Sequence, residues 1–413
     1  MSQSEPEICD VGNGYSVYWP AQKVLVLIEY LAKQPQGLVG EVTITIAEAT
    51  LCESLRCNLN TEAKTKAIAK KAQESYGLLS LPEWARLVET TCVLVLRRYR
   101  EGEPLRLLTI DTPVEPLSYR LAPIVHQDKA AILFGDGGLG KSTLGLVCAM
   151  LVATGETLAG LAALLGRVLY LDYEDDLAVH VRRMRAIAAC HPKLKAAEVL
   201  YQAATEPLCN IVHTLLRRVQ SERIDFLVID SLAPATGGDA SAEAATKAFK
   251  AIRQLNVGTL ILAHIPKTNE QEQASSIYGS VFFKNFARST WELKKEQEVG
   301  ADVSVLGLFN RKSNLSRLHH PIGIRVQQNA EGSAIQFDQC DLGETIDLEK
   351  GLPVASRIRN FLEKDGGMYS AKEIADAIES PLATVKVTLS RQNKIKWHSI
   401  GEGRDTEWTC LNR

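Results

Sequence analysis

Residues 130–142 read AAILFGDGGLGKS, and residues 143–154 continue as TLGLVCAMLVAT. The run Ala130–Phe134 is short and apolar, as is typical of a buried strand, whereas the longer apolar stretch from Thr143 predicts a helix. Between them, Gly135–Ser142 fits the pattern G-x-x-x-x-G-K-[ST]. Strand, glycine-rich loop and helix in this order predict a phosphate-binding loop at the start of a helix.

This loop supplies groups that hold a nucleotide and its metal ion. Glycines let the backbone amides curl around phosphates, and the helix start adds positive potential. The lysine reaches the β- and γ-phosphate oxygens and so takes part in catalysis, while Ser142 coordinates Mg²⁺. We expect ATP and Mg²⁺ as ligands, with nucleotide contacts from Gly135, Gly137, Gly138, Gly140, Lys141, Ser142 and Thr143. The alternative is a glycine-rich turn that fits the pattern by chance.

A second metal ligand is expected after the apolar run in residues 224–231, IDFLVIDS. A buried strand that ends in an aspartate commonly supplies the carboxylate for Mg²⁺ at such sites. Ligands bind parallel sheets at the carboxyl ends of their strands, which is where Asp230 would lie. The alternative is that Asp230 only caps the loop that follows.

A third acidic strand end, in residues 167–176 (RVLYLDYEDD), lies between these two motifs, and a later apolar run ends at His264. Together with the phosphate-binding loop, this order of strand ends resembles the RecA superfamily over residues 120–330. Within it, the chain is most similar to the RepA-like and DnaB-like hexameric helicase ATPases.

The resemblance implies roles for two residues at these strand ends. Glu174 would activate the attacking water, because a carboxylate accepts a proton and orients water. His264 would contact the nucleotide as a sensor of the γ-phosphate. Asp172 and Asp175 compete with Glu174, and a histidine of the core is the alternative for His264.

The resemblance also implies a nucleotide site shared between subunits, with a basic side chain from the neighbour. Residues 309–314, FNRKSN, offer Arg311 as this catalytic group, because a planar guanidinium spreads transition-state charge well. Lys312 and Arg288 are alternatives, since the DnaB-like pattern separates its lysine and arginine by two positions and this chain has them adjacent. The expected assembly is a homo-oligomer, with a hexamer as the first choice.

Two loops after strand ends, residues 234–241 and 266–284, are expected to bind DNA. In the families that the chain resembles, such loops line a central pore and hold single-stranded DNA. Lys267, Thr268 and Lys284 would contact phosphates here. The alternative is a pair of ordinary surface loops.

The C-terminal region reads as three helices, at 354–364, 370–378 and 381–392, followed by a β-hairpin, which is a winged-helix pattern. Ser380 and Pro381 predict the start of the third helix. Val385 and Leu389 mark its buried face. Its other face and the hairpin would contact duplex DNA through Thr384, Thr388, Arg391, Lys394, Lys396 and Arg404. The alternative is a protein-docking domain.

The fold class is therefore α/β, with a RecA-type P-loop core, a mostly parallel sheet, an N-terminal α+β domain and a C-terminal winged helix. In the accessory domain, residues 1–115, we expect helices at 24–31 and 61–73 and strands at 92–97 and 105–110. In the core, residues 116–340, we expect parallel strands at 130–134, 167–173, 226–230 and 259–263, then antiparallel ones at 289–293, 303–309, 322–326 and 334–337. Residues 341–353 form a linker and residues 354–413 the winged helix.

Composition narrows the function classes. The 413 residues carry a formal net charge of −2, so any attraction to DNA must come from local patches. No apolar stretch is long enough to span a bilayer, which indicates a cytoplasmic protein with no membrane partner. The nine cysteines are scattered, as expected for free thiols. We expect an ATP-dependent, oligomeric DNA motor or helicase-like ATPase of a mobile element, or alternatively a DNA-bound ATPase switch or regulator that recruits other enzymes.

Overall fold

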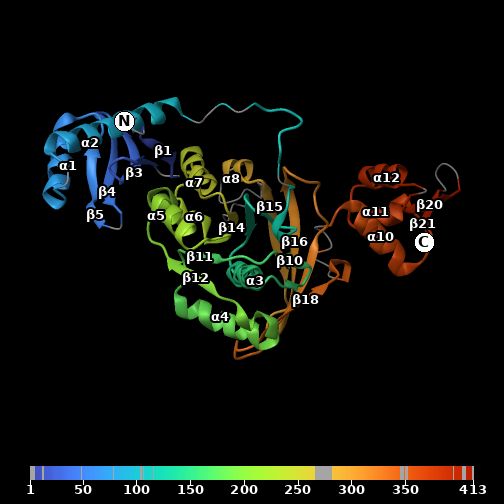
Figure 1. The fold of residues 1–413 in the computed structure, drawn as a ribbon. Helices are drawn as coiled ribbons and strands as arrows, with labels where there is room; N and C mark the ends of the chain where they lie inside the picture. Colours follow the sequence, from blue (N-terminus) through green and yellow to red (C-terminus); the bar gives the residue numbers. More distant parts are fainter. Residues whose placement is uncertain are drawn as a thin grey trace. The chain divides into compact units, whose positions relative to one another are not determined.

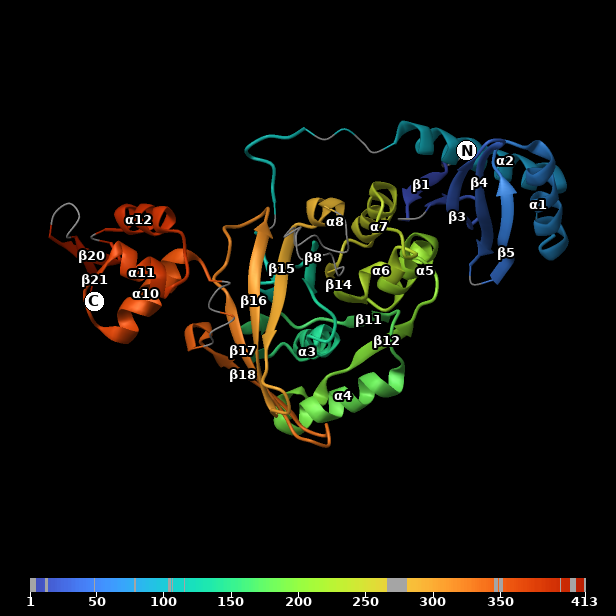
Figure 2. The ribbon, with the colours of Figure 1, turned by 180° about the vertical axis from the view of Figure 1, so that it is seen from behind.

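The computed structural model describes residues 5–11, 14–47, 49–77, 79–102, 105, 107–114, 116–265, 281–344, 348, 352–393, 395–401 and 406–411. The chain forms two compact units, Met1–Pro116 with His213–Arg217, and Leu117–Val212 with Arg218–Arg413. Figures 1 and 2 show their elements from opposite sides. None of the helices in these described ranges is long and apolar enough to cross a bilayer.

The first unit is an antiparallel sheet covered by two helices. Its strands pair in sequence order: β1 (Glu7–Asp10), β2 (Gly14–Trp19), β3 (Val24–Gln34), β4 (Gly37–Ile46) and β5 (Ala49–Asn58). The helices α1 (Glu62–Ser75) and α2 (Leu81–Glu101) follow, and their apolar faces join the core of the sheet. The helix expected at 61–73 is thus confirmed as α1.

Three other expectations for this unit were wrong. Residues 24–31 form β3 rather than a helix, because Val24, Val26 and Ile28 are buried while Leu25 is exposed, which is the period of a strand. Residues 92–97 lie inside α2 instead of forming a strand, because they continue a buried stripe at helical spacing. No strand forms at the described residues among 105–110, where no neighbouring strand pairs with them.

The second unit is built on a nine-stranded sheet of order β12-β11-β13-β14-β8-β15-β16-β17-β18. Its parallel strands are β8 (Ala130–Gly135), β11 (Val168–Asp172), β12 (Val199–Ala203), β13 (Phe226–Asp230), β14 (Gly258–His264) and β15 (Ser289–Glu296). The antiparallel strands β16 (Val303–Ser313), β17 (Ile322–Gln328) and β18 (Ile335–Cys340) complete the sheet. The α/β fold class, the mostly parallel sheet and the antiparallel strands β16, β17 and β18 are confirmed. The expectation of an antiparallel strand at 289–293 was wrong, because β15 pairs parallel with β8 and extends the parallel part of the sheet by one strand.

Helices cover both faces of the parallel strands, which explains why these strands are apolar throughout. On one face lie α3 (Lys141–Thr154), α4 (Leu177–Cys190) and the short η1 (Pro192–Ala196); on the other lie α5 (Leu208–Ser221), α6 (Leu232–Ala235) and α7 (Ala242–Leu255) (Figures 1 and 2). Alternate strand residues such as Tyr170, Val228 and Leu262 pack in the core cluster with α3. Asp230, two residues after Val228, therefore points toward the start of α3.

Smaller elements complete this part of the chain. A four-stranded sheet of order β7-β6-β10-β9 comprises β6 (Tyr119–Ala122), β7 (Val125–His126), β9 (Thr157–Leu158) and β10 (Leu161–Ala163). The short helices are α8 (Val281–Phe286) and η3 (Leu342–Glu344).

The C-terminal residues form three helices and a small sheet with their own core. The helices are α10 (Val354–Asp365), α11 (Ala371–Ala377) and α12 (Leu382–Arg391), and the strands β19 (Tyr369–Ser370), β20 (Trp397–Ile400) and β21 (Glu407–Cys410) pair in the order β19-β21-β20. The three expected helices and the hairpin are confirmed. The expected helix start was wrong by one residue, because Pro381 itself is the extended N-cap residue and Ser380 accepts a hydrogen bond from Arg357.

Candidate functional site

Four strand ends that are far apart in sequence meet at one edge of the sheet. The parallel register places Asp172 of β11 beside Asp230 of β13, and His264 of β14 beside Gly135 of β8. All these residues end their strands, so their side chains and the following loops share the carboxyl edge, where such sheets bind ligands.

The phosphate-binding loop has the backbone geometry that its glycines permit. Gly140 has a φ of 86° and is the N-cap residue of α3. This left-handed conformation favours glycine. A Cβ atom on Gly135 would lie 2.5 Å from the carbonyl oxygen of Leu293 in the neighbouring β15, so only glycine allows these strands to approach so closely. The free amides at the start of α3 therefore border the loop.

Lys141 is the first residue of α3 and is folded over this loop. Its Nζ donates hydrogen bonds to the carbonyl oxygens of Gly135 (3.0 Å) and Asp136 (2.6 Å) and lies 3.2 Å from Nδ1 of His264. Burial lowers the pKa of the Lys141 ammonium, and the nearby carboxylates of Glu174 and Asp230 oppose that shift. Phosphate oxygens would give this buried cation better partners than neutral carbonyls do.

The oxygen atoms of Asp230 and Ser142 fit a magnesium ion. Asp230 is 2% exposed and accepts a hydrogen bond of 2.7 Å from the hydroxyl of Tyr170. Burial raises the pKa of Asp230, whereas hydrogen bonds from Tyr170 and Ser142 lower it. Asp230 forms no ion pair with any described side chain, so its charge is left for a cation. A carboxylate and a hydroxyl are the oxygen ligands that Mg²⁺ prefers.

Glu174 lies in the loop after β11 and faces two other strand ends. Its Oε1 accepts a hydrogen bond from the hydroxyl of Ser231 and lies 3.5 Å from Nε2 of His264. The side chain is 37% exposed, so water can reach it. His264 thus lies between Lys141 and Glu174, which makes it a contact of both residues rather than an isolated core histidine.

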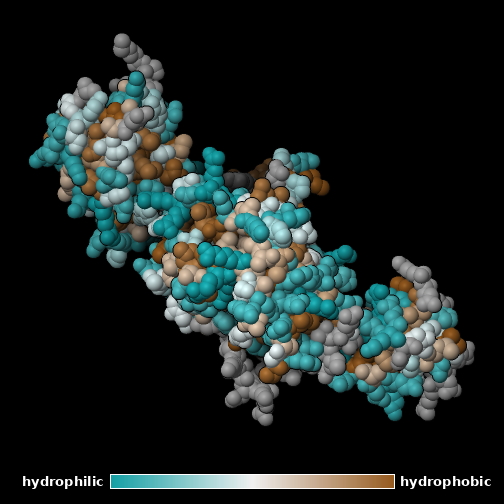
Figure 3. All heavy atoms as spheres, turned by 90° about the horizontal axis from the view of Figure 1, so that it is seen from below, coloured by the Kyte–Doolittle hydropathy of each residue, from teal (hydrophilic) through white to brown (hydrophobic). Residues whose placement is uncertain are grey.

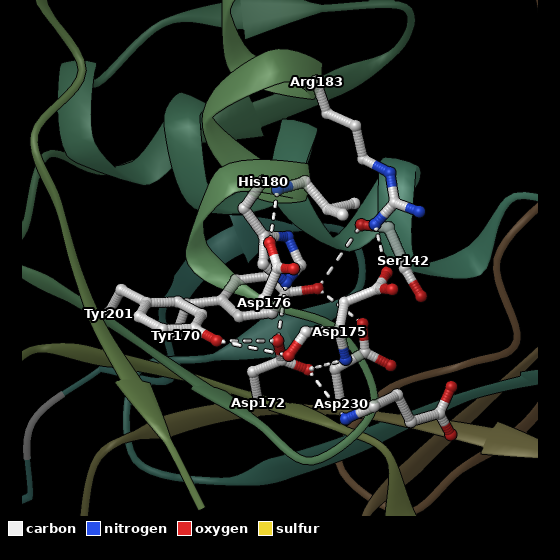
Figure 4. A network of polar contacts seen from close by, with 11 residues as sticks. Ser142, Tyr170, Asp172, Asp175, Asp176, His180, Arg183, Tyr201 and Asp230 are labelled. Atoms are coloured by element: carbon white, nitrogen blue, oxygen red, sulfur yellow. Dashed lines mark hydrogen bonds and ion pairs between the residues drawn. The ribbon is translucent and has the colours of Figure 1, made fainter.

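Asp172 shapes the loop that carries Glu174. Its Oδ1 accepts hydrogen bonds from the amides of Glu174 (3.0 Å) and Asp175 (3.2 Å), and its Oδ2 lies 2.8 Å from Nε2 of His180 and 3.1 Å from the hydroxyl of Tyr201 (Figure 4). Burial raises the pKa of Asp172, but the contact with His180 and the hydrogen bonds from the two amides outweigh it and hold the pKa at about 2. Both oxygens are therefore occupied, and Asp172 is a positioning residue.

The other competitor for the role of Glu174 is also engaged elsewhere. The carboxylate of Asp175 lies 2.7 Å from Nη1 of Arg183 on α4, in an ion pair that Figure 4 shows. Of Asp172, Glu174 and Asp175, it is Glu174 whose carboxylate faces Ser231 and His264.

Sequence patterns did not single out Ser231, Tyr170, His180 or Tyr201. Ser231 has the clearest signal, because it directly follows Asp230 at a strand end that was already assigned to the site. Tyr170 precedes Asp172 by two residues and so lies on the same face of β11, which is the only hint of its contact with Asp230. His180 and Tyr201 come from separate elements and have no such signal.

The candidates for the basic side chain from a neighbour lie at other strand ends. Arg311 donates a 2.7 Å hydrogen bond to Glu292, and its guanidinium lies 4.9 Å from the centre of the Phe309 ring. Lys312 donates hydrogen bonds to the carbonyl oxygens of Lys284 and Asn285 in α8 and of Ala287 just after it. Arg288, which is exposed, precedes Ser289, and Ser289 pairs with Ala131 near the amino end of β8. The site of the same copy lies at the carboxyl end of β8, so a role for Arg288 would require a second copy.

The structure describes only some of the residues that are expected to contact DNA. Lys284 lies on α8 and is half-buried. On α12, Thr384 and Arg391 are exposed and Thr388 is half-buried, whereas Val385 and Leu389 are fully buried as expected. Lys396 is exposed. Lys267, Thr268, Lys394 and Arg404 lie outside the described residues.

One comparison with known proteins, a match to a family model, agrees with the nucleotide site. Residues 99–270 match the model of a family described as an AAA domain, a range that contains the phosphate-binding loop, Glu174, Asp230 and His264. A solved KaiC-like protein from the hyperthermophilic archaeon Pyrococcus horikoshii is 15% identical, and the match covers 55% of this chain and 100% of that one with a TM-score of 0.39. No curated protein matches the sequence. The family match and the architecture of the sheet support an ATPase of the RecA-like class.

Proposed function

We propose that this protein is an ATP-dependent, oligomeric DNA-binding ATPase of the RepA-like and DnaB-like class, which acts as a motor or helicase. The observation that carries the proposal is the meeting of Lys141, Asp230 and Glu174 at one sheet edge. These residues supply a phosphate-binding cation, a buried metal-binding carboxylate and an accessible carboxylate base within one network.

Binding of ATP would replace hydrogen bonds that the side chains of the site make within the protein by contacts with the nucleotide. Lys141 would exchange the carbonyls of Gly135 and Asp136 for β- and γ-phosphate oxygens, and the amides at the start of α3 would hold the same phosphates. Ser142 and Asp230 would hold Mg²⁺, which neutralises phosphate charge when bound. The buried contact of Asp230 with Tyr170 fixes the direction of that carboxylate.

Hydrolysis would then depend on Glu174. Its carboxylate orients a water molecule in line with the γ-phosphate and accepts a proton as the water oxygen bonds to phosphorus and the bond to ADP breaks. Ser231 holds one oxygen of this carboxylate, and His264 contacts both Glu174 and Lys141. His264 is therefore placed to respond to whether the γ-phosphate is present.

Single-stranded DNA would bind the two loops that follow strand ends, residues 234–241 and 266–284. Duplex DNA would bind residues 354–413, which would act as a winged helix. This DNA-binding part of the proposal is supported by the separate core of those C-terminal residues and by the exposed polar face of α12. A hexamer would let Arg311, or Arg288, act on a neighbour's nucleotide.

A DNA-bound ATPase switch that does not unwind DNA is the second candidate. It is favoured by residues 236–241, the loop after α6, which contain no basic side chain that could hold phosphates of a translocating strand. Unwinding of a forked duplex, measured beside DNA-stimulated phosphate release, separates the two. Stimulated ATP hydrolysis without strand separation would assign the switch.

The proposed hydrolysis is tested by Glu174→Gln. This variant should bind ATP as the wild type does, because Lys141 and Asp230 are intact, and turn it over at least about a hundredfold more slowly, because the base is lost. The exposed Glu198→Gln is the matched control and should be unaffected. Normal turnover by Glu174→Gln, or its loss in Asp175→Asn instead, would refute the assignment.

A further inference from the structure

Five aliphatic side chains that follow α2 are almost fully exposed to solvent in the structure. We call Leu105, Leu107, Leu108, Ile110 and Val114 the apolar strip; each is between 85% and 103% exposed. Isolated exposed leucines are ordinary, but a cluster of large aliphatic side chains within ten residues usually marks an interaction surface. The segment that carries the strip is acidic, because the sequence from Glu101 to Leu117 contains four acidic residues and one arginine.

The core has a groove of complementary character between α3, α4 and η1. Its volume is about 490 Å³, and its apolar floor includes Met150, Met184, Ala188 and Leu194. Two cations, Arg185 and Lys195, line its rim, and neither forms an ion pair with any described residue. In Figure 3, which views the molecule from below Figure 1, where α4 lies, apolar side chains interrupt the hydrophilic surface of the core.

We propose that the apolar strip of one copy of this chain docks in the α3–α4 groove of a second copy. The methionines on the floor adapt their shape to aliphatic side chains such as Leu107 and Leu108. The positive charges at the rim of the groove complement the acidic residues around the apolar strip, which fixes the direction of docking. Every copy carries one strip and one groove, so the contact is heterologous and joins copies in a row or closes them into a ring.

This inference rests on the proposed oligomer and identifies the contact that builds it. Its chemistry is separate from that of the nucleotide site, because none of the strip or groove residues belongs to the carboxyl edge of the sheet. Disruption of this interface should therefore reduce assembly and leave nucleotide binding to single copies unchanged.

The test uses three variants of the full chain, all altered at exposed positions so that folding is not at risk. The strip variant is Leu107→Ser with Leu108→Ser, and the groove variant is Arg185→Glu with Lys195→Glu. The matched control is Val299→Ser, a fully exposed aliphatic residue outside the strip. Sedimentation velocity with Mg²⁺ and a non-hydrolysable ATP analogue reports the mass of each species, and a fluorescent ATP analogue reports nucleotide binding.

We expect wild type and Val299→Ser to assemble, and each of the two other variants to self-associate at least about tenfold more weakly. An equal mixture of strip and groove variants should form dimers, because the intact strip of one meets the intact groove of the other. Assembly of either variant like the wild type, a wild type that stays monomeric, or a mixture that contains only monomers would overturn the proposal. Absence of nucleotide binding in all proteins, with assembly as expected, would instead contradict only the proposed ATPase.

Discussion

At the scale of single residues, the orientation of Glu174 depends on one hydroxyl. We predict that Ser231→Ala lowers ATP turnover about tenfold, since a hydrogen bond to a charged group is worth about 1.5 kcal/mol, and leaves the KM for ATP nearly unchanged. Ser231→Thr keeps the hydroxyl and should recover most of the rate. Steady-state phosphate release measures both. An alanine variant with wild-type kcat would show that Ser231 does not position the base.

Asp172 should stabilise the fold in a pH-dependent way. Its pKa is about 2 in the folded protein and lies below the ordinary aspartate value of 3.8, so its contribution is complete above about pH 4 and is lost as the pH falls toward 2. Asp172→Asn should therefore lower the free energy of unfolding by about 2 kcal/mol at pH 7.

Urea unfolding of wild type and Asp172→Asn at pH 7, 5 and 3.5 tests this prediction. The difference in the free energy of unfolding between the two proteins should be the same at pH 7 and pH 5. It should be smaller at pH 3.5, because only the wild type has the Asp172 carboxylate whose stabilising contribution is lost on protonation. The exposed Asp302→Asn serves as control. A difference that is constant or grows on acidification would contradict the assigned contacts.

Single residues also show how far the sequence can predict the site. The position of Lys141, Ser142 and Asp230 at one edge of the sheet was predictable, because each belongs to a motif with a known place relative to a strand or helix. The contacts of Glu174 with Ser231 and His264 were not, because they depend on the register of β11, β13 and β14, which sequence spacing does not state.

At the scale of elements, patterning predicted the core better than the first unit. Strands buried on both faces, such as β11 and β13, read as short apolar runs between helices and have few alternative interpretations. In β3 and α2 the choice between strand and helix depends on which residues are buried. The choice becomes clear only when the pattern is followed over the whole element. In β3 this pattern is the alternation of Val24, Val26 and Ile28, and in α2 it is the helical spacing of the buried stripe.

The ends of β15 and β16 carry the prediction of a shared active site. Arg311→Ala should lose turnover, and an equal mixture with Lys141→Ala should recover up to about a quarter of it, because that fraction of sites pairs an intact lysine with an intact neighbouring arginine. Phosphate release by the mixture is the measurement. If Arg311→Ala alone stays active and a mixture of Arg288→Ala with Lys141→Ala recovers phosphate release, the role belongs to Arg288. If neither arginine variant recovers activity when mixed with Lys141→Ala, a shared site is excluded.

At the scale of the whole molecule, the C-terminal residues should contribute DNA affinity that is separable from hydrolysis. Residues with a core of their own can be removed without unfolding the rest. A chain that ends near position 351 should keep its basal ATPase activity and lose duplex affinity.

The salt dependence of binding distinguishes phosphate-binding side chains from protein docking. In the full chain, Arg391→Ala with Lys396→Ala should lower the slope of duplex affinity against salt by about one for each phosphate that is no longer neutralised. Duplex affinity that is equal in the full and shortened chains across salt would assign residues 354–413 to protein docking instead.

We claim above all that ATP is hydrolysed at the carboxyl edge of the sheet. The direct measurement is phosphate release at saturating ATP and Mg²⁺ from wild type, Lys141→Ala and the control Lys129→Ala, a lysine outside the phosphate-binding loop. We predict turnover by wild type and by the control, and a loss of at least about a hundredfold in Lys141→Ala, because the buried cation that meets the phosphates is gone. Equal phosphate release by Lys141→Ala and wild type would contradict the claim.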